Sequence, residues 1–161
     1  MSITTGFGYD CHQLVQGRAL IVGGVEIPHS HGLLGHSDAD VLTHAIIDAL
    51  LGAAALGDIG SHFPDTDPRF KDADSLRLLR EAVGLLREGG CVIQHVDATI
   101  VIEQPKIMPF AAEIRERLRV AMEVEVGQIN IKATRGEGMG WIGRLEGAAA
   151  LAVATVDRPL P

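Results

Sequence analysis

The amino-acid sequence predicts an α+β fold, a two-layer sandwich in which a mixed β-sheet carries helices on one face. Three observations predict it. Strand-like segments open the chain, helix-like and strand-like segments alternate after them, and hydrophobic residues make up 47% of the 161 residues, which suffices for one buried core. We therefore expect a single domain that spans residues 1–161.

The first third of the chain divides into strands and one helix. Strands are expected at residues 2–9 and 19–27, where Gly23-Gly24 turns the second segment into a hairpin. A polar, glycine-containing segment follows, and Ser37-Asp38 can then cap a helix that continues to about Ala55. This helix is apolar almost all round, which predicts that it is buried.

The segment at residues 57–73 shows no periodicity, and long loops in small domains are usually functional, so we expect a lid here. The remaining expected elements are a helix from Asp74 or Ser75 to about Glu88, a strand at 92–103, a helix at about 109–123, a strand at 129–132, a glycine-rich turn at 136–143 and a last strand at about 147–156.

Composition excludes several classes of protein. The formal charge of −7 argues against a general nucleic-acid binder, so any phosphate site must use a few local cations or metals. The apolar runs fall short of the roughly 20 residues that a membrane span needs. Cys11 and Cys91 are too few for a disulfide framework. We expect a soluble, cytoplasmic protein with reduced thiols.

Asp10, His12 and His44 are candidate metal ligands. Asp10 and His12 stand two apart in an extended segment, so their side chains share one face, separated by roughly 7 Å along the chain. His44 lies between Asp40 and Asp48 in a polar row on an otherwise apolar helix. Three protein ligands are typical of an open catalytic zinc site. The alternative from the residues alone is a surface stripe with a satisfied histidine.

Two further segments are candidates for ligand contacts. His36 and Ser37 stand at the expected helix start, where backbone amides can hold a phosphate, although simple capping is the alternative. Asp58, Asp65 and Asp67 can accept hydrogen bonds from polyol hydroxyls, although they also suit ordinary turns.

Four motifs in order closely resemble the 2-C-methyl-D-erythritol 2,4-cyclodiphosphate synthase family. They are Gly6-Phe7-Gly8-Tyr9-Asp10-Cys11-His12, Gly35-His36-Ser37-Asp38-Ala39-Asp40-Val41, Gly57-Asp58-Ile59-Gly60 and Phe63-Pro64-Asp65-Thr66-Asp67-Pro68. The likeness continues through Ile21-Val22-Gly23-Gly24-Val25, Asp48 to Ala53, Pro105-Lys106 and Gly143-Arg144, and so spans essentially the whole chain.

The resemblance implies a lyase of the non-mevalonate route to isoprenoid precursors, a homotrimer with active sites between subunits. Its substrate would be 4-diphosphocytidyl-2-C-methyl-D-erythritol 2-phosphate, and its products the 2,4-cyclodiphosphate and CMP. The family's zinc ligands fall on Asp10, His12 and His44. Glu137 falls on the carboxylate for a second divalent ion, magnesium or manganese.

The resemblance also implies residue roles. His36 would stabilise the transition state and, with Ser37, contact phosphate oxygens. Substrate contacts would come from Asp58, Ile59 and Gly60 at the ribose and from Phe63, Pro64, Asp65, Thr66 and Asp67 at the methylerythritol unit. The cytidine pocket of a neighbouring subunit would be formed by Ile102, Glu103, Gln104, Pro105, Lys106, Ile107, Met108, Ala133 and Thr134. Trp141 and Arg144 would face a trimer axis that can hold an isoprenoid diphosphate.

Two departures from the family pattern bear on activity. Arg135 stands where a threonine usually contacts the diphosphate, and Leu145 interrupts a Gly-Arg-Gly-Glu-Gly run. Arg135 can still bind phosphate, or it can displace the second metal. Two other functions therefore remain open: a zinc phosphohydrolase that uses water as its nucleophile, and a catalytically impaired trimer that binds isoprenoid diphosphates.

Overall fold

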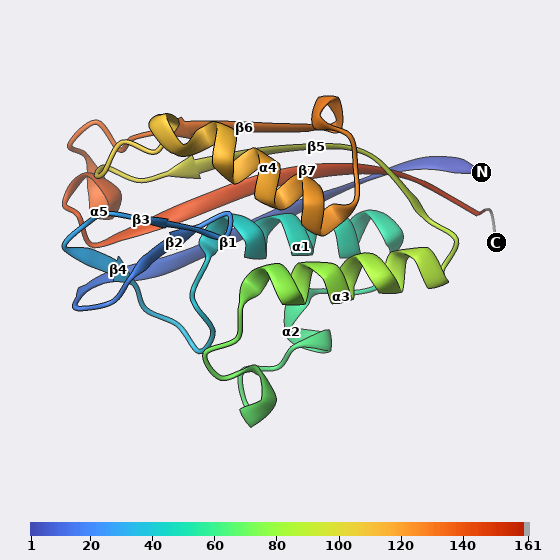
Figure 1. Ribbon diagram of the computed structural model, residues 1–161, viewed down its shortest axis with the longest axis horizontal. Helices are drawn as coiled ribbons and strands as arrows, with labels where there is room; N and C mark the ends of the chain where they lie inside the picture. Colours follow the sequence, from blue (N-terminus) through green and yellow to red (C-terminus); the bar gives the residue numbers. More distant parts are fainter. Residues whose placement is uncertain (160–161) are drawn as a thin grey trace.

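The computed structural model describes residues 1–159 and contains a mixed sheet with helices packed against it (Figure 1). Its strands are β1 (Ser2–Gln16), β2 (Leu20–Val22), β3 (Val25–Ile27), β4 (His31–Leu33), β5 (Val92–Val101), β6 (Ile129–Thr134) and β7 (Gly147–Arg158). Its α-helices are α1 (Val41–Ala54), α2 (Ile59–His62), α3 (Ser75–Glu88), α4 (Ala111–Met122) and α5 (Gly140–Gly143). Short 3-10 helices are η1 (Pro68–Phe70), η2 (Met108–Phe110) and η3 (Val126–Gln128).

The main sheet has five strands in the order β4-β1-β7-β5-β6. β1 and β7 pair antiparallel along almost their whole length, from Ser2 opposite Arg158 to Gln13 opposite Gly147. β5 pairs antiparallel with β7 and parallel with β6, so the sheet is mixed. The predicted α+β class with a mixed sheet is therefore confirmed, and β2 and β3 form the hairpin expected at Gly23-Gly24.

The helices lie on one side of the sheet in two tiers. α1 packs directly on β1 and β7, α3 packs on α1, and α4 lies against β6 and α3 (Figure 1). α1 buries residues on every side, as its apolar sequence predicts. The opposite face of the sheet leaves large apolar side chains exposed, namely Ile3, Phe7, Tyr9 and Val153. Among the described residues 1–159, no helix is long and apolar enough to cross a lipid bilayer.

The expected elements were wrong at four points. β1 continues to Gln16 instead of ending near residue 9, and the polar segment before the first long helix contains β4. The first long helix is not capped by Ser37-Asp38: Ala39 has a φ of 57°, Asp40 is the N-cap, and α1 begins at Val41. The aperiodic segment 57–73 contains α2 and η1.

Glycines on β1 allow α1 to approach the sheet very closely. A Cβ built on Gly8 would lie 1.9 Å from the carbonyl oxygen of Ala45, and one built on Gly6 would lie 2.0 Å from the carbonyl oxygen of Ala49. Both contacts are with helix backbone, which cannot turn aside as a side chain can. Glycine is therefore required at these two positions, and it fixes how far α1 stands from the strand that carries Asp10 and His12.

We expect Gly8→Ala to lower the free energy of unfolding by about 3 kcal/mol or more, because the added methyl group overpacks this contact. Chemical denaturation of the metal-free chain measures it. Gly84→Ala is the matched control: a Cβ there meets nothing within 4 Å, and the position lies inside α3. That control should be neutral or stabilising by up to about 1 kcal/mol. Equal stability of the two variants would contradict the close-approach argument.

Candidate metal centre and substrate cavity

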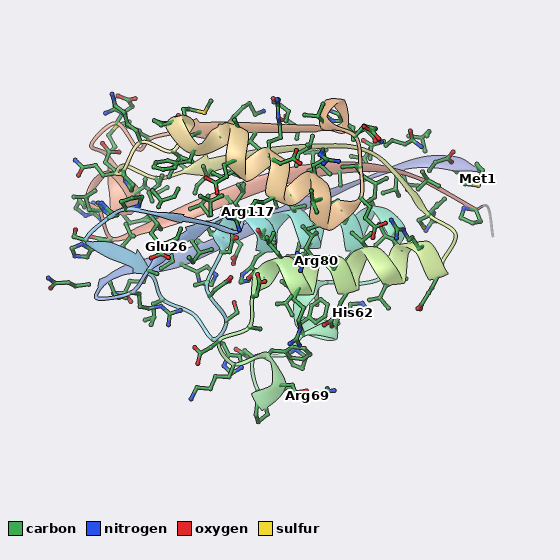
Figure 2. The ribbon with its side chains drawn as sticks, viewed as in Figure 1. Met1, Glu26, His62, Arg69, Arg80 and Arg117 are labelled. Carbon is green, nitrogen blue, oxygen red and sulfur yellow. The ribbon has the colours of Figure 1, made fainter. Side chains whose placement is uncertain are left out.

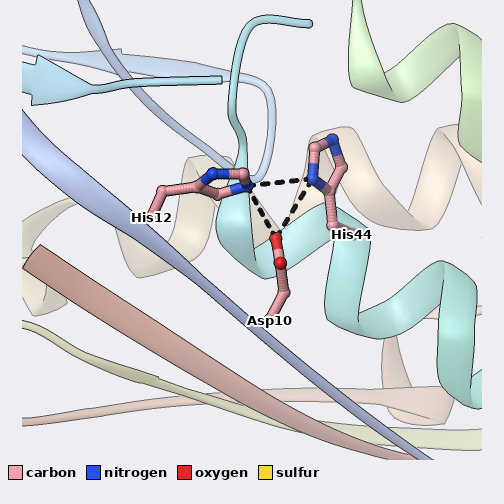
Figure 3. A group of neighbouring side chains, drawn as sticks. All are labelled: Asp10, His12 and His44. Carbon is pink, nitrogen blue, oxygen red and sulfur yellow. Dashed lines mark hydrogen bonds and ion pairs between the residues drawn. The ribbon is translucent and has the colours of Figure 1, made fainter. Parts of the chain in front are cut away.

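Asp10, His12 and His44 come together where β1 passes under the first turn of α1 (Figure 3). Asp10 and His12 lie on the inner face of β1, and their cross-strand partners on β7 are Ala150 and Ala148, which leave room above the sheet. His44 points from α1 toward the same spot. The strand period and the helix stripe thus place these three side chains together, as the sequence predicts.

One oxygen of Asp10 faces a nitrogen of each histidine. Asp10 Oδ2 lies 2.8 Å from His12 Nε2 and 3.1 Å from His44 Nδ1, and the two nitrogens are 3.3 Å apart. One ligand atom from each residue lies within 4.8 Å of the other two. Two imidazole nitrogens and one carboxylate oxygen are a donor set that zinc accepts.

Electrostatics at this cluster favour a cation. Burial alone raises the pKa of Asp10, but hydrogen bonds with His12 and His44 and attraction to them outweigh it and lower that pKa to about 2. Burial alone lowers the pKa of His44, but its hydrogen bond to Asp10 and the charges of Asp10, Asp40 and Asp38 outweigh it and raise that pKa above the ordinary value. Positive charge is thus stabilised among these groups.

The tautomer of His12 also fits a metal ligand. Its Nδ1 lies 3.0 Å from the carbonyl oxygen of Leu34. A carbonyl can only accept, so Nδ1 carries a proton, and Nε2 is the ring nitrogen that a metal ion would bind in place of its contact with Asp10. A hydrogen bond of this kind on the far ring nitrogen is usual for metal-bound histidines.

The start of α1 is closed by the buried side chain of Asp40. Its carboxylate accepts from the amides of Gly23, Gly24 and Thr43 and from the hydroxyl of Thr43. A buried carboxylate, which repels an anion, therefore lies at the helix start that the sequence offers to a phosphate, and the phosphate contact of His36 and Ser37 stays a prediction. His36 and Ser37 lie before the helix.

A cavity of about 440 Å³ opens beside the metal ligands. His36 and Ser37 line it together with His12 and His44, and the ring of His36 is held by the carbonyl oxygen of Asp67, 3.2 Å from its Nε2. The remaining lining residues are Gly35, Ile59, Gly60, Phe63, Pro64, Asp65, Phe70 and Leu78. The structure thus brings the candidate phosphate-contacting residues to the candidate metal ligands.

The segment at 57–73 forms one wall of this cavity and extends away from the helices, with Arg69 at its outer end (Figure 2). Its carboxylates partly serve its own folding. Asp58 caps α2 by accepting from the amide and hydroxyl of Ser61, and Asp67 pairs with Arg69 at 2.6 Å. Asp48 of α1 ties the segment to the body, because its carboxylate accepts from the amide of Ile59 at 2.7 Å.

A second cavity, of about 380 Å³, lies apart from the first and shares no lining residue with it. It is mainly apolar, and its walls are Ile102, Pro105, Lys106, Ile107, Met108, Pro109, Ala133, Thr134 and Arg135. These are mostly the residues expected at the cytidine. Within one chain, the structure therefore does not bring the expected nucleotide residues to the metal ligands.

The turn after β6 is organised by Glu103. Its carboxylate accepts from the amides of Gly136 and Gly138, at 2.8 and 3.2 Å. Glu137, between them, is exposed, and its carboxylate lies 3.7 Å from the guanidinium of Arg135. Arg135 and Glu137 therefore sit side by side at the edge of the second cavity, where an arginine charge lies next to the candidate ligand of a second ion.

Trp141 and Arg144 lie near the C-terminal part of β1. Trp141 lines a small cavity with His12 and Gly147, and Arg144 pairs with Glu146 at 2.8 Å. Leu145, between them, has a φ of 62°, in the left-handed region. A glycine usually stands here in the family pattern, and glycine adopts this conformation without the cost of roughly 1–2 kcal/mol that other residues incur.

Ser75 contacts the candidate ligand His44, and Asp38 contacts Ser75, whereas the sequence analysis assigned both only to helix capping. Ser75 Oγ lies 2.8 Å from His44 Nε2 and is hydrogen-bonded to Asp38. Ser75 is 31 residues from His44. No short-range pattern could have joined them, because pairing of the segments before α1 and α3 brings them together.

The fold and the site define a class: an α+β protein with an Asp-His-His candidate metal centre beside a substrate-sized cavity. The sequence profile described as the YgbB family matches residues 3–157. The chain belongs to this family.

Relatives and solved structures agree with this assignment. 2-C-methyl-D-erythritol 2,4-cyclodiphosphate synthase of Geobacter metallireducens is 58% identical over 95% of this chain and 98% of its own length. The synthase of Bacillus subtilis is 52% identical over 95% and 97%. A solved structure of 2C-methyl-D-erythritol-2,4-cyclodiphosphate synthase in a CDP-bound form superposes with a TM-score of 0.87 at 36% identity, covering 95% of this chain and 99% of that one. The bifunctional IspDF of Campylobacter jejuni gives 0.94 at 40% identity, covering 98% of this chain and 43% of that one. The resemblance expected from the motifs is confirmed.

Proposed function

We propose that this protein converts 4-diphosphocytidyl-2-C-methyl-D-erythritol 2-phosphate into 2-C-methyl-D-erythritol 2,4-cyclodiphosphate and CMP, in the non-mevalonate route to isoprenoid precursors. It is thus a phosphorus–oxygen lyase, formed by one domain over residues 1–161. Relatives named for this activity are 52% and 58% identical over nearly the whole chain. The observation that carries the proposal is the convergence of Asp10, His12 and His44 beside the larger cavity.

Asp10, His12 and His44 would hold zinc, and Glu137 would contribute to a second site for magnesium or manganese. When bound, these ions would neutralise negative charge on the phosphates during transfer. The reaction needs no covalent enzyme intermediate. An oxygen of the 2-phosphate attacks the β phosphorus, and the bond from that phosphorus to the bridging oxygen breaks as CMP leaves with the electron pair.

The chain's own residues bind and orient the substrate. His36, steadied by the carbonyl oxygen of Asp67, lines the cavity and would contact phosphate oxygens there as charge builds up. Ser37 also lines this wall, while Ile59 to Asp65 enclose the polyol. Attacker and target belong to one substrate, so holding it in a folded conformation supplies much of the rate increase.

The separation of the two cavities supports a homotrimer in which each active site combines two chains. One chain offers the metal ligands, and the cavity around Ile107 and Thr134 of the next chain receives the cytidine. The apolar sheet face with Phe7, Tyr9 and Val153 provides a surface for assembly. Trp141 and Arg144 then lie toward the axis, where the positive guanidinium suits an isoprenoid diphosphate.

The test compares two substrates that differ only in the 2-phosphate. A cyclase needs that phosphate as its nucleophile, so CMP should be released from 4-diphosphocytidyl-2-C-methyl-D-erythritol 2-phosphate but not from 4-diphosphocytidyl-2-C-methyl-D-erythritol. A zinc phosphohydrolase activates water instead and should release CMP from both. Comparable CMP release from the two compounds would overturn the proposed cyclisation.

Arg135 motivates a second candidate, a catalytically impaired binder of isoprenoid diphosphates. Its guanidinium lies near the carboxylate of Glu137 and would compete there with a second cation.

We expect Arg135→Thr to lower the magnesium concentration that gives half-maximal CMP release by roughly 3- to 10-fold, because an exposed pair contributes up to about 1 kcal/mol. Arg87→Thr is the control, since Arg87 pairs with Glu123 on a distant surface. An unchanged magnesium response would show that Arg135 does not compete with the ion.

A further inference from the structure

Beyond the proposed ligands, His44 is held from behind by a buried hydroxyl and a carboxylate. Ser75 is the first residue of α3, and its side chain is fully buried. Its Oγ lies 2.8 Å from His44 Nε2, the ring nitrogen that faces away from Asp10. The same hydroxyl is hydrogen-bonded to a carboxylate oxygen of Asp38, whose second oxygen accepts from the amide of Ser75 at 3.0 Å.

The directions of these hydrogen bonds determine the tautomer of His44. A carboxylate only accepts, so the single hydroxyl proton of Ser75 points to Asp38. Ser75 Oγ must then accept from His44, which places a proton on Nε2. His44 Nδ1, which now contacts Asp10 and His12, is then the ring nitrogen that a metal ion would bind in place of those contacts. Ser37 Oγ, 3.2 Å from Nε2, is a longer second acceptor.

Backbone pairing holds this arrangement in place. The backbone amide of Asp72 donates to the carbonyl oxygen of His36 at 2.8 Å, and the backbone amide of Asp38 donates to the carbonyl oxygen of Ala73 at 3.1 Å. The segment before α1 and the segment before α3 therefore lie side by side. This pairing brings Ser75, with Asp38 behind it, to the ring of His44. Within residues 1–159, neither Ser75 nor Asp38 is hydrogen-bonded to Asp10 or His12.

We propose that Ser75 and Asp38 are positioning residues for the metal centre, a hydroxyl–carboxylate relay that fixes His44 in the tautomer and ring orientation that binds zinc. The inference rests on the metal centre proposed above and goes beyond it. Outer groups of this kind orient the ligand and make its free nitrogen more basic, and their loss typically weakens metal binding by about 10- to 100-fold.

The test is zinc affinity of the full-length, metal-free protein, measured by competition with a chromophoric chelator. Ser75→Ala should weaken zinc binding by about 10- to 100-fold. Asp38→Asn should also weaken it, and the double variant should bind zinc no more weakly than Ser75→Ala, because Asp38 acts through the hydroxyl. If the double variant loses zinc affinity by the product of the two separate losses, Ser75 and Asp38 act independently and the relay is overturned.

Thr43→Val is the matched control for mere destabilisation. Thr43 is also fully buried, and its hydroxyl donates to the carboxylate of Asp40 at 2.8 Å, but it makes no contact with a ligand histidine through that hydroxyl. Thr43→Val should lower the melting temperature and leave zinc affinity unchanged. Equal zinc affinity in Ser75→Ala and the unaltered chain, or equal losses in Ser75→Ala and Thr43→Val, would overturn the proposal. Failure of the unaltered chain to bind zinc would instead contradict the proposed metal centre.

Discussion

His44→Ala should abolish stoichiometric zinc binding and lower kcat for CMP release by about a thousandfold or more, since several kcal/mol of charge stabilisation are lost with the ion. The reason is geometric: His44 Nδ1 supplies one of the three donor atoms that lie within 4.8 Å of one another. Two remaining donors do not make a catalytic zinc site. Zinc content by mass spectrometry of metals, together with CMP release under saturating substrate, measures both effects.

His29→Ala is the control for this prediction. His29 lies between β3 and β4 and pairs with His31 at a ring separation of 6.1 Å, away from the candidate ligands. Its loss should leave zinc content and CMP release unchanged. Because α1 is anchored by buried apolar residues, His44→Ala should keep its fold in the metal-free state. Full CMP release by His44→Ala without zinc would contradict the proposed metal centre.

Phe7→Glu should dissociate the proposed trimer and abolish CMP release while leaving zinc binding intact. Phe7 is 62% exposed and lies opposite Val153, which is 41% exposed, at the centre of the bare sheet face. A carboxylate buried in such an interface without a partner costs about 3 kcal/mol or more. Light scattering gives the mass of the assembly, and the zinc content reports whether the site within each chain survives.

Val120→Glu is the matched control, because Val120 is 52% exposed on α4, outside the sheet face. It introduces the same charge and should leave assembly and CMP release unchanged. The decisive result would be a monomer that binds zinc but releases no CMP. This result is expected because the two cavities lie apart within one chain. A monomeric Phe7→Glu variant with full activity would contradict the shared active site.

Much of the site was predictable because the periodicity of strands and helices determines which side chains share a face. Asp10 and His12 share a face of β1, and His44 belongs to the only polar row that the sequence showed on the first long helix. The α+β class followed from the order of strand and helix patterns. The sequence-based sheet prediction missed the far part of β1 and the whole of β4, which are fixed by pairing with each other, including Leu33 opposite Leu14.

Long-range contacts account for what the sequence did not predict. The start of α1 depends on Asp40, whose carboxylate is held by Gly23 and Gly24 of the hairpin. The exposed face of β1 carries Phe7 while the buried face carries glycine, the reverse of ordinary patterning. The buried glycines follow from the close approach of α1, and the exposed apolar side chains suit the proposed trimer contact; neither effect acts locally.

Phosphorus NMR of the reaction products distinguishes cyclisation from hydrolysis most directly. Purified protein with zinc and magnesium is mixed with 4-diphosphocytidyl-2-C-methyl-D-erythritol 2-phosphate, and the spectrum is followed over time. We expect two coupled signals from a cyclic diphosphate, appearing in step with CMP and absent for His44→Ala. A linear bisphosphate appearing with CMP would contradict cyclisation and would make the protein a hydrolase.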